Sequence, residues 1–220
     1  MVDVRVIAID GPAGAGKSTV ARLVAEKTGL PFLDTGAMYR CVALAVLERG
    51  VDPSDESAVG ALAASSVIEL AGDAVALDGR DVSREIRGQA VSDTVSLVAV
   101  HSPVRTAMRE QQRTWIVTQG GGVVEGRDIS TVVFPDAVLK VFLTASPAER
   151  ARRRVAQSGG DVASVAASIE ERDRIDSSRA DSPLRSADDS VVIDSSDLTT
   201  DEVVARIIAE FESRTGVSRA

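Results

Sequence analysis

The feature that most constrains the fold is a glycine-rich loop near the start of the chain. Residues 11–18 read Gly-Pro-Ala-Gly-Ala-Gly-Lys-Ser and match the pattern G-x-x-x-x-G-K-[ST] without a mismatch. The apolar, β-branched run 4–9 precedes the loop, and residues 16–28 follow it with apolar side chains at helical spacing. In such a unit, backbone N–H groups and the positive end of the helix converge on phosphate oxygens. The sequence therefore predicts a nucleoside triphosphate site.

The residues of this loop have distinct predicted roles. Lys17 is expected to reach the β- and γ-phosphates, and the Ser18 hydroxyl is expected to bind Mg²⁺. The glycines let the backbone approach the phosphates closely. The predicted site for the triphosphate consists of Gly11, Pro12, Ala13, Gly14, Ala15, Gly16, Lys17, Ser18 and Thr19.

P-loop proteins include GTPases, motors and small-molecule kinases, and the sequence separates these classes. GTPases typically read guanine with an Asn-Lys-x-Asp motif, whereas this chain contains no asparagine. A motor usually has an apolar strand that ends in an aspartate. The nearest run here, 123–125, ends in Glu125 and continues as Gly-Arg-Asp. A chain of 220 residues suits a compact kinase.

Short strands alternate with helices along most of the chain, which indicates an α/β fold with a doubly wound parallel sheet and flanking helices. Between about 55 and 100 the pattern changes to an antiparallel hairpin, 67–70 with 75–77, and then a helical stretch, 83–100. We interpret this region as an insert. The other predicted strands are 31–33, 123–125, 138–143 and 191–193, and the other predicted helices are 36–49, 103–118, 147–157, 162–179 and 199–214. We expect Gly29 to end the first helix, Asp78 and Gly79 to form a turn after the hairpin, and Thr199 or Thr200 to cap the last helix.

Charge and composition exclude several classes of protein. The formal net charge of -8 argues against a surface that binds nucleic acid, because phosphate binding needs a basic face. No apolar run approaches the ~20 residues that span a membrane, and no secretory signal is visible. The single cysteine, Cys41, cannot form an internal disulfide. We therefore expect a cytoplasmic, monomeric protein with no nucleic-acid or membrane partner.

Three further segments carry candidate binding residues. Residues 34–40, Asp-Thr-Gly-Ala-Met-Tyr-Arg, follow the second predicted strand, and residues 126–129, Gly-Arg-Asp-Ile, follow a core strand. Ligands of open parallel sheets bind at the carboxyl ends of strands, so both segments are expected to face the same crevice as the loop. On the late helix, Arg172, Asp176 and Arg179 are spaced i, i+4, i+7 and share one face.

Together these segments resemble the signature of the bacterial cytidylate kinases, within the nucleoside monophosphate kinase group. The resemblance runs from about residue 6 to residue 204. It implies transfer of the γ-phosphoryl group of ATP to CMP or dCMP, with Mg²⁺, by a single P-loop kinase domain over residues 1–220. It also implies a core of about 1–54, 101–147 and 185–220, a monophosphate-binding insert of about 55–100 and a helical lid of about 148–180.

The same resemblance implies roles for particular residues. The acceptor phosphate would be held by Thr35, Arg40, Arg127 and Arg179. The cytosine would be read by Ser96, Arg105 and Asp128, with Tyr39 packing nearby. Arg172 and Asp176 would contact the sugar, Arg87 would help to close the insert, and Asp34 would lie near Mg²⁺. Catalysis would depend on Lys17, Arg127 and Arg179, and the lid would carry Arg152, Arg153 and Arg154.

The chemistry of these residues agrees with such a reaction. Planar guanidinium groups bind phosphates bidentately and keep their charge, and a loose, highly charged transition state needs positioning and electrostatics more than a general base. Cytosine presents an N4 amino donor, for which the Asp128 carboxylate is the matching acceptor. Uracil presents an acceptor there and would be disfavoured by ~10²-fold if the carboxylate is buried.

Other interpretations stay open at this stage. Residues 152–154 also fit the solvated face of a helix, and Arg172, Asp176 and Arg179 also fit an intrahelical salt-bridge ladder. The enzyme could phosphorylate UMP as well as CMP, or another small acceptor, and an ATP-binding switch without turnover is a further alternative. Two positions depart from the family pattern: Ser130 stands where glycine is usual, and Ile175 stands where a polar or basic residue is more common.

Overall fold

The computed structural model describes residues 5–216, so Val4, the first residue of the first predicted strand, lies outside the described residues. The chain divides into two compact units. The larger unit combines Met1–Leu33 with Ile116–Ala220, and the smaller unit is the continuous stretch Asp34–Trp115. Among the described residues, no helix has the length and apolar character needed to cross a bilayer.

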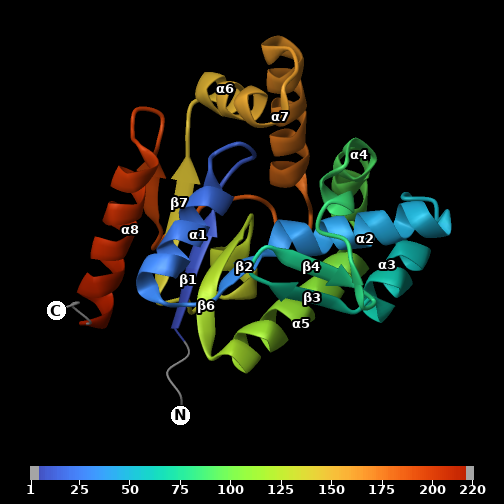
Figure 1. Cartoon of the computed structure of the whole chain (residues 1–220), viewed down its shortest axis with the longest axis horizontal. Coiled ribbons are helices and arrows are strands. Elements are labelled where there is room, and N and C mark those ends of the chain that lie inside the picture. Colours follow the sequence, from blue (N-terminus) through green and yellow to red (C-terminus); the bar gives the residue numbers. More distant parts are fainter. Residues whose placement is uncertain (1–4, 217–220) are drawn as a thin grey trace. The chain divides into compact units, whose positions relative to one another are not determined.

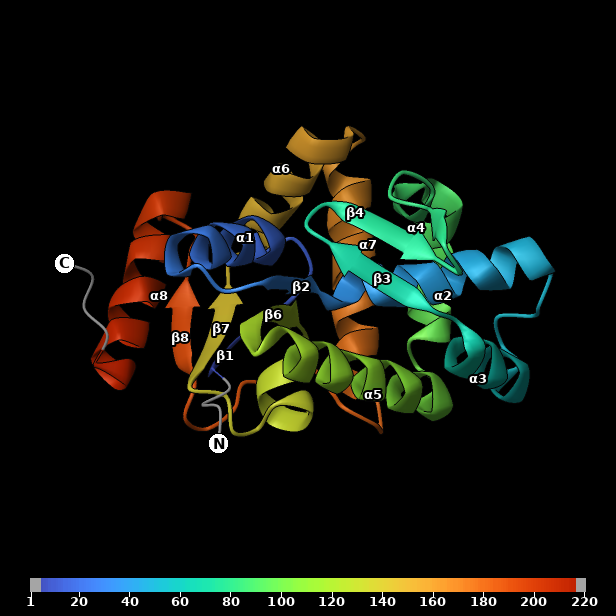
Figure 2. The ribbon, with the colours of Figure 1, turned by 60° about the horizontal axis from the view of Figure 1, so that its bottom comes forward.

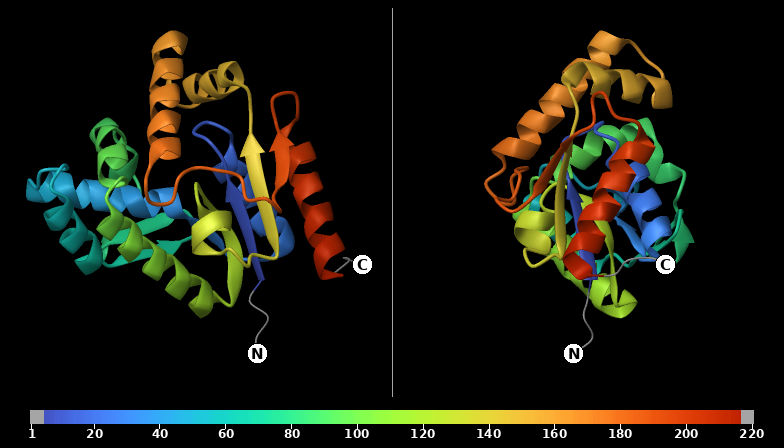
Figure 3. Two further views of the ribbon diagram at one scale, coloured as in Figure 1. Left: turned by 180° about the vertical axis from the view of Figure 1, so that it is seen from behind. Right: turned by 90° about the vertical axis from the view of Figure 1, so that its left-hand side faces the viewer.

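The larger unit is built on a five-stranded sheet in which β1 (Arg5–Asp10) lies at the centre. β1 pairs in parallel with β6 (Gly121–Gly126) on one side and β7 (Leu139–Thr144) on the other. β2 (Phe32–Asp34) lies beyond β6, and β8 (Val191–Asp194) pairs in parallel with β7 (Figure 3). Because these strands are parallel, the loops that follow β1, β6 and β7 leave the same edge of the sheet.

Two helices cover one face of this sheet and close the main core. α1 (Lys17–Thr28) contributes Val20 and Val24, and α8 (Thr200–Thr215) contributes Ile207, to one apolar cluster with residues of β1, β6, β7 and β8 (Figure 1). α1 ends at Gly29 in a left-handed conformation, as predicted. Thr199 forms a capping box with Glu202 at the start of α8, which confirms the predicted cap.

The remaining helices of the larger unit follow β6 and β7. After β6 the chain makes a short π-helical turn, η2 (Ile129–Val133). After β7 come α6 (Pro147–Ser158) and α7 (Val162–Ser178), which pack against each other (Figure 2). Both helices confirm the predicted segments 147–157 and 162–179 to within a residue or two.

The smaller unit contains most of the predicted insert and the helices beside it. It consists of α2 (Thr35–Arg49), α3 (Glu56–Ser65), α4 (Gln89–Val98) and most of α5 (Ser102–Gln119), with a three-stranded antiparallel sheet. That sheet is formed by β3 (Ile68–Ala71), β4 (Ala74–Leu77) and β5 (Arg80–Asp81), and its first two strands make the predicted hairpin (Figure 2). The predicted turn at Asp78 and Gly79 has positive φ at both residues.

Three local predictions were wrong or incomplete. The helix predicted over 83–100 is a 3₁₀ turn, η1 (Glu85–Arg87), followed by α4, because Gly88 is extended and interrupts the helix. α3 was not predicted, since its sequence is mostly alanine, glycine and serine and shows only a weak apolar pattern. The π-helical turn η2 was not predicted either. Its first residues, Ile129 and Ser130, are held by hydrogen bonds to Asp10 of β1, which is distant in the sequence.

Candidate active site

The phosphate loop is held against its neighbours at two glycines. Gly11 has a φ of 152°, and a Cβ atom there would lie 1.9 Å from the carbonyl oxygen of Leu143 in β7. Gly14 has a φ of 76°, and a Cβ atom there would lie 3.1 Å from the Cβ of Arg150 in α6. Any side chain at Gly11 would displace the loop from the sheet. The sequence pattern of the loop is therefore required by its packing as well as by phosphate chemistry.

Lys17 begins α1 and is almost fully buried, with 6% of its surface exposed. Its Nζ donates a hydrogen bond to the carbonyl oxygen of Pro12 at 2.8 Å. Burial, together with the positive charges of Arg127 and Arg172, lowers the pKa of Lys17 to about 7, although Glu125 and Asp10 act in the opposite direction. A bound phosphate would favour the protonated amine, so the loop is poised to gain positive charge when an anion arrives.

Helices α6 and α7 contact the phosphate loop through two charged residues. Asp173 of α7 accepts a hydrogen bond from the Ala13 amide at 3.0 Å and forms an ion pair with Arg150 of α6. Arg150 also donates to the Ala13 carbonyl oxygen at 3.0 Å. Both polar groups of the Ala13 backbone are thus bound by residues of the predicted lid segment.

The three arginines predicted for the lid differ in their environments. The side chain of Arg152 is 71% exposed and pairs with Glu149, which fits the solvated-face interpretation. Arg153 pairs with Glu149 as well, and it also donates to Ser195 at 2.7 Å and 3.0 Å and to the Ala15 carbonyl oxygen at 3.4 Å. Arg153 therefore lies against the phosphate loop. Arg150, to which the sequence assigned no role, is the arginine that contacts Ala13.

A carboxylate joins the arginines that follow β6 and α7. Asp176 Oδ2 accepts from Arg127 Nε at 2.9 Å, and Asp176 Oδ1 accepts from Arg179 Nη2 at 2.6 Å. Burial alone would raise the pKa of Asp176, but Arg127, Arg179 and Arg172 together lower it. This cluster is more than an intrahelical ladder, because Arg127 comes from a loop 49 residues away.

The turn after Arg127 is anchored on the end of β1. Asp10 is fully buried, and its carboxylate accepts hydrogen bonds from the Ile129 amide at 2.9 Å and from the Ser130 amide at 2.7 Å. The Ser130 hydroxyl donates a third hydrogen bond to Asp10 at 2.5 Å. Asp128, the predicted reader of cytosine, is the buried residue that starts this turn.

In the smaller unit, Arg40 of α2 is held by two other elements. Its Nη1 donates to the Ile86 carbonyl oxygen of η1 and to the Ser92 hydroxyl of α4, both at 2.9 Å. Ser96 lies one turn further along α4 and shares a helix face with Ser92. Sequence reasoning missed Ser92, and the i, i+4 spacing with Ser96 is the signal that points to it.

The other predicted residues of the smaller unit occupy varied positions. The Arg105 guanidinium lies over the Tyr39 ring, 5.4 Å from its centroid, in a cation–π arrangement. Thr35 is buried at the start of α2, which Asp34 caps by accepting from the Ala37 amide, while Arg87 is exposed. Cys41 is buried as predicted, and burial, assisted by Asp34, raises the pKa of its thiol to about 12.

Comparison with known proteins decides the family. A model of the family described as "Cytidylate kinase" matches residues 7–213. The chain belongs to the cytidylate kinase family. A relative of this name from Rhodococcus opacus is 47% identical over 97% of each chain. Another, from Pelotomaculum thermopropionicum, is 51% identical over 94% of this chain and 96% of its own.

Similarity to solved structures of lower identity shows the fold alone. The crystal structure of a sugar kinase from Janibacter sp. superposes with a TM-score of 0.52 at 16% identity and covers 99% of both chains. The parallel sheet with flanking helices predicted for this chain is confirmed by the structure, and the sugar kinase shares this fold.

The two predicted magnesium ligands, Ser18 and Asp34, both offer oxygen donors. Within residues 5–216, no three His, Cys, Asp or Glu side chains form a group that could hold a metal ion. Ser18 presents an exposed hydroxyl in the first turn of α1, and the Asp34 carboxylate is half-buried at the start of α2. Oxygen donors of this kind fit Mg²⁺, which usually keeps several waters and takes further ligands from substrate phosphates.

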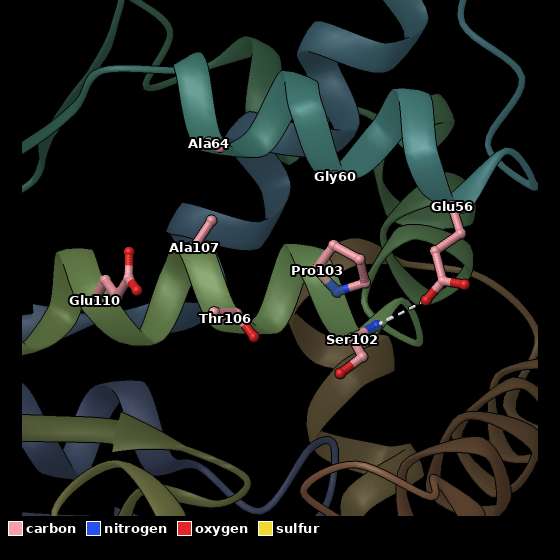
Figure 4. Close-up of a pocket in the computed structure, with 8 residues that line it drawn as sticks. All are labelled: Glu56, Gly60, Ala64, Ser102, Pro103, Thr106, Ala107 and Glu110. Carbon is pink, nitrogen blue, oxygen red and sulfur yellow. Dashed lines mark hydrogen bonds between the residues drawn. The ribbon is translucent and has the colours of Figure 1, made fainter.

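One hollow in the smaller unit lies away from the predicted site residues. It has a volume of about 540 Å³ and runs between α3 and α5, with none of the predicted residues in its lining (Figure 4). The two helices approach closely at Gly60, where a Cβ atom would lie 2.6 Å from the Cβ of Pro103. At one end, Glu56 accepts a hydrogen bond from the Ser102 amide (Figure 4). The hollow is a consequence of this helix packing.

Proposed function

We propose that this chain transfers the γ-phosphoryl group of ATP to CMP or dCMP, giving ADP and CDP or dCDP, in pyrimidine nucleotide metabolism. The observation that carries this proposal is membership of the cytidylate kinase family over residues 7–213. The phosphate loop with its buried Lys17 supports it from the geometry of the larger unit. The chain acts in the cytoplasm as a monomer, without a nucleic-acid or membrane partner.

On the donor side, the loop amides and Lys17 bind the phosphates of ATP. The low pKa of Lys17 supports this role, because the amine takes up a proton as the phosphates arrive and then neutralises the developing charge. Ser18 and Asp34 would hold Mg²⁺, which would supply further positive charge to neutralise the phosphates. Helices α6 and α7, which form the predicted lid over 148–180, cover the loop and exclude water from it.

On the acceptor side, arginines hold the phosphate of the monophosphate. Arg40 and Thr35 provide its contacts from the smaller unit, and Arg127 and Arg179 provide them from the larger unit. Asp176 orients both of these last two arginines through its two oxygens. It also accepts hydrogen bonds from the sugar hydroxyls, together with Arg172 as a donor. Catalysis rests on Lys17, Arg127 and Arg179.

The base is selected by hydrogen-bond complementarity. The buried Asp128 carboxylate accepts from the N4 amino group of cytosine, and Ser96 and Arg105 contact the other polar atoms of the ring. The cation–π contact of Arg105 with Tyr39 supports this assignment, because it fixes the guanidinium in one orientation. Arg87, on the exposed 3₁₀ turn, closes the insert over the nucleotide.

A substrate panel tests the proposed function. Purified protein is assayed for ADP formation from ATP and Mg²⁺ with CMP, dCMP, UMP, AMP or GMP. We expect turnover with CMP and dCMP and at least ~10²-fold less with UMP, since a buried carboxylate repels the uracil O4. Turnover with AMP and none with CMP would refute the proposal, and ATP binding without transfer to any acceptor would favour a switch.

The same panel tests the role of Asp128. In Asp128→Asn the side-chain amide can donate to the uracil O4, so the preference for CMP over UMP is expected to fall by ~10-fold or more. Equal activity of the unmodified enzyme toward CMP and UMP would favour the alternative, a kinase for both pyrimidine monophosphates.

A further inference from the structure

The carboxylate of Asp10 connects the centre of the sheet to the turn that carries Arg127 and Asp128. The backbone of Asp10 is fixed, because β1 pairs at this residue with Gly126 of β6 on one side and Phe142 of β7 on the other. The side chain of Asp10 therefore provides a rigid attachment point at the edge where the phosphate loop begins.

All three hydrogen bonds that Asp10 accepts come from the two residues that follow Asp128. Oδ1 binds the Ile129 amide, and Oδ2 binds both the amide and the hydroxyl of Ser130. Burial raises the pKa of Asp10, and the nearby Asp128 charge raises it further, while these hydrogen bonds lower it. Loss of one bond would leave a buried carboxylate less well satisfied.

The turn itself transmits this anchoring to Asp128. The Asp128 carbonyl oxygen accepts from the amides of Val132 and Val133 at 2.9 Å and 3.2 Å, and the Ile129 carbonyl oxygen accepts from the Phe134 amide at 2.7 Å. Residues 128–134 thus form one hydrogen-bonded unit. The hydrogen bonds to Asp10 hold Ile129 and Ser130 in place. They therefore also fix the start of this unit, which is Asp128 and follows directly after Arg127.

From this arrangement we infer that Ser130 and Asp10 are positioning residues for the acceptor nucleotide, with the Ser130 hydroxyl holding Asp128 and Arg127 in their binding orientation. The inference deepens the proposed function and rests on the roles assigned there to Arg127 and Asp128. A glycine at position 130 would supply the amide bond to Asp10 but would lack the hydroxyl bond.

The test compares Ser130→Ala with a matched control, Ser66→Ala. Ser66 is also a buried serine, and its hydroxyl donates to the Leu62 carbonyl oxygen at 2.8 Å at the end of α3, so both variants lose one buried hydrogen bond. For Ser130→Ala we expect KM for CMP to rise by ~5-fold, KM for ATP to stay within ~2-fold, and the preference for CMP over UMP to fall by ~3-fold, because small displacements weaken oriented contacts. Ser66→Ala should lose thermal stability with no change in either KM or in the preference.

A second variant removes the same hydrogen bond by a different replacement. Ser130→Gly removes the whole hydroxymethyl group, and it should shift KM for CMP in the same direction. Unchanged KM for CMP in both Ser130 variants would overturn the inference, and so would an equal rise in KM for ATP and for CMP, which would indicate a general effect on the phosphate loop.

The outcome also separates this inference from the proposed function. If the unmodified protein does not phosphorylate CMP, the proposed function fails whatever the variants do. If it phosphorylates CMP, and Asp128→Asn weakens discrimination against UMP while the Ser130 variants behave like the unmodified enzyme, only the positioning role is refuted.

Discussion

The arginines of the larger unit and those of the smaller unit are held in different ways. Arg127 and Arg179 share the Asp176 carboxylate, and Arg150 pairs with Asp173, so acids within the larger unit fix its arginines. In the smaller unit, the contacts of Arg40 include a carbonyl oxygen and a hydroxyl, and Arg105 lies over an aromatic ring. Removal of the Asp176 carboxylate thus disturbs two arginines, whereas removal of the Ser92 hydroxyl in the smaller unit disturbs one hydrogen bond of Arg40.

The largest effect is expected when the shared acid is neutralised. Asp176→Asn removes the negative charge that Arg127 and Arg179 share in a buried site, so the free energy of unfolding should fall by about 3 kcal/mol. We expect kcat/KM for CMP to fall by ~100-fold as the arginines lose their orientation. Denaturant unfolding and steady-state kinetics measure the two effects.

Glu171→Gln is the matched control for this variant. Glu171 pairs with Arg174 on the same helix, and both side chains are more than half exposed. An exposed pair of this kind contributes little, so stability and kcat/KM should stay unchanged. Similar losses in both variants would show that the buried cluster has no special role.

An intermediate effect is expected from the titration of Lys17. With the pKa of the free amine lowered to about 7, the residue is protonated below that pH and increasingly neutral above it. Phosphates bind the protonated form, so ATP binding should be accompanied by uptake of up to one proton above pH 7 and by none well below it. Calorimetry at pH 8, in buffers of different ionisation enthalpy, measures this uptake.

The pH dependence of affinity provides a second measure of the same group. Affinity for ATP should weaken toward higher pH, by at most ~10-fold per pH unit, between about 7 and the pKa of the nucleotide-bound amine. In Lys17→Met this dependence should disappear, along with most of the activity. A proton uptake that persists in Lys17→Met would assign the titration to another group.

The smallest effect is expected in the smaller unit. Ser92→Ala removes the hydrogen bond from Arg40 to the Ser92 hydroxyl and leaves the bond to the Ile86 carbonyl oxygen in place. KM for CMP should rise by ~2- to 3-fold with kcat nearly unchanged, consistent with the ~0.5–1.5 kcal/mol of a single hydrogen bond. Asp93→Asn, an exposed neighbour on α4 that binds Gln89, should leave KM for CMP unaltered. Equal KM values in the two variants would argue against a role for Arg40 in acceptor binding.

Features that depend on neighbouring residues were predictable from the sequence. The phosphate loop, the helix that follows it, the hairpin of the insert and the cap of α8 all rest on patterns within about fifteen residues. The position of Arg127 after a core strand was predictable for the same reason, because a strand and its turn are contiguous. The prediction of one helix over 83–100 was wrong because Gly88 is extended and interrupts an otherwise helical pattern.

Contacts between distant segments were not predictable from one sequence. Asp10 and Ser130 are separated by 120 residues, and nothing in their local patterns indicates that they meet. The contact of Asp173 with the Ala13 amide spans 160 residues. From the sequence alone, the arginines were assigned to the nucleotides or to a salt-bridge ladder within the late helix. The pairing of Asp176 with Arg127 and that of Asp173 with Arg150 were not foreseen.

The way the two units divide the chain has a consequence for synthesis. The smaller unit is one uninterrupted stretch that ends at Trp115, so all of its residues have left the ribosome while much of the larger unit is still to be made. Val20 and Val24 of α1 share one apolar cluster with Ile207 of α8, which follows every other described element along the chain. Part of the apolar face of α1 must therefore wait for α8 after the sheet strands have been made, and a product that lacks α8 would expose that part to aggregation and to chaperones.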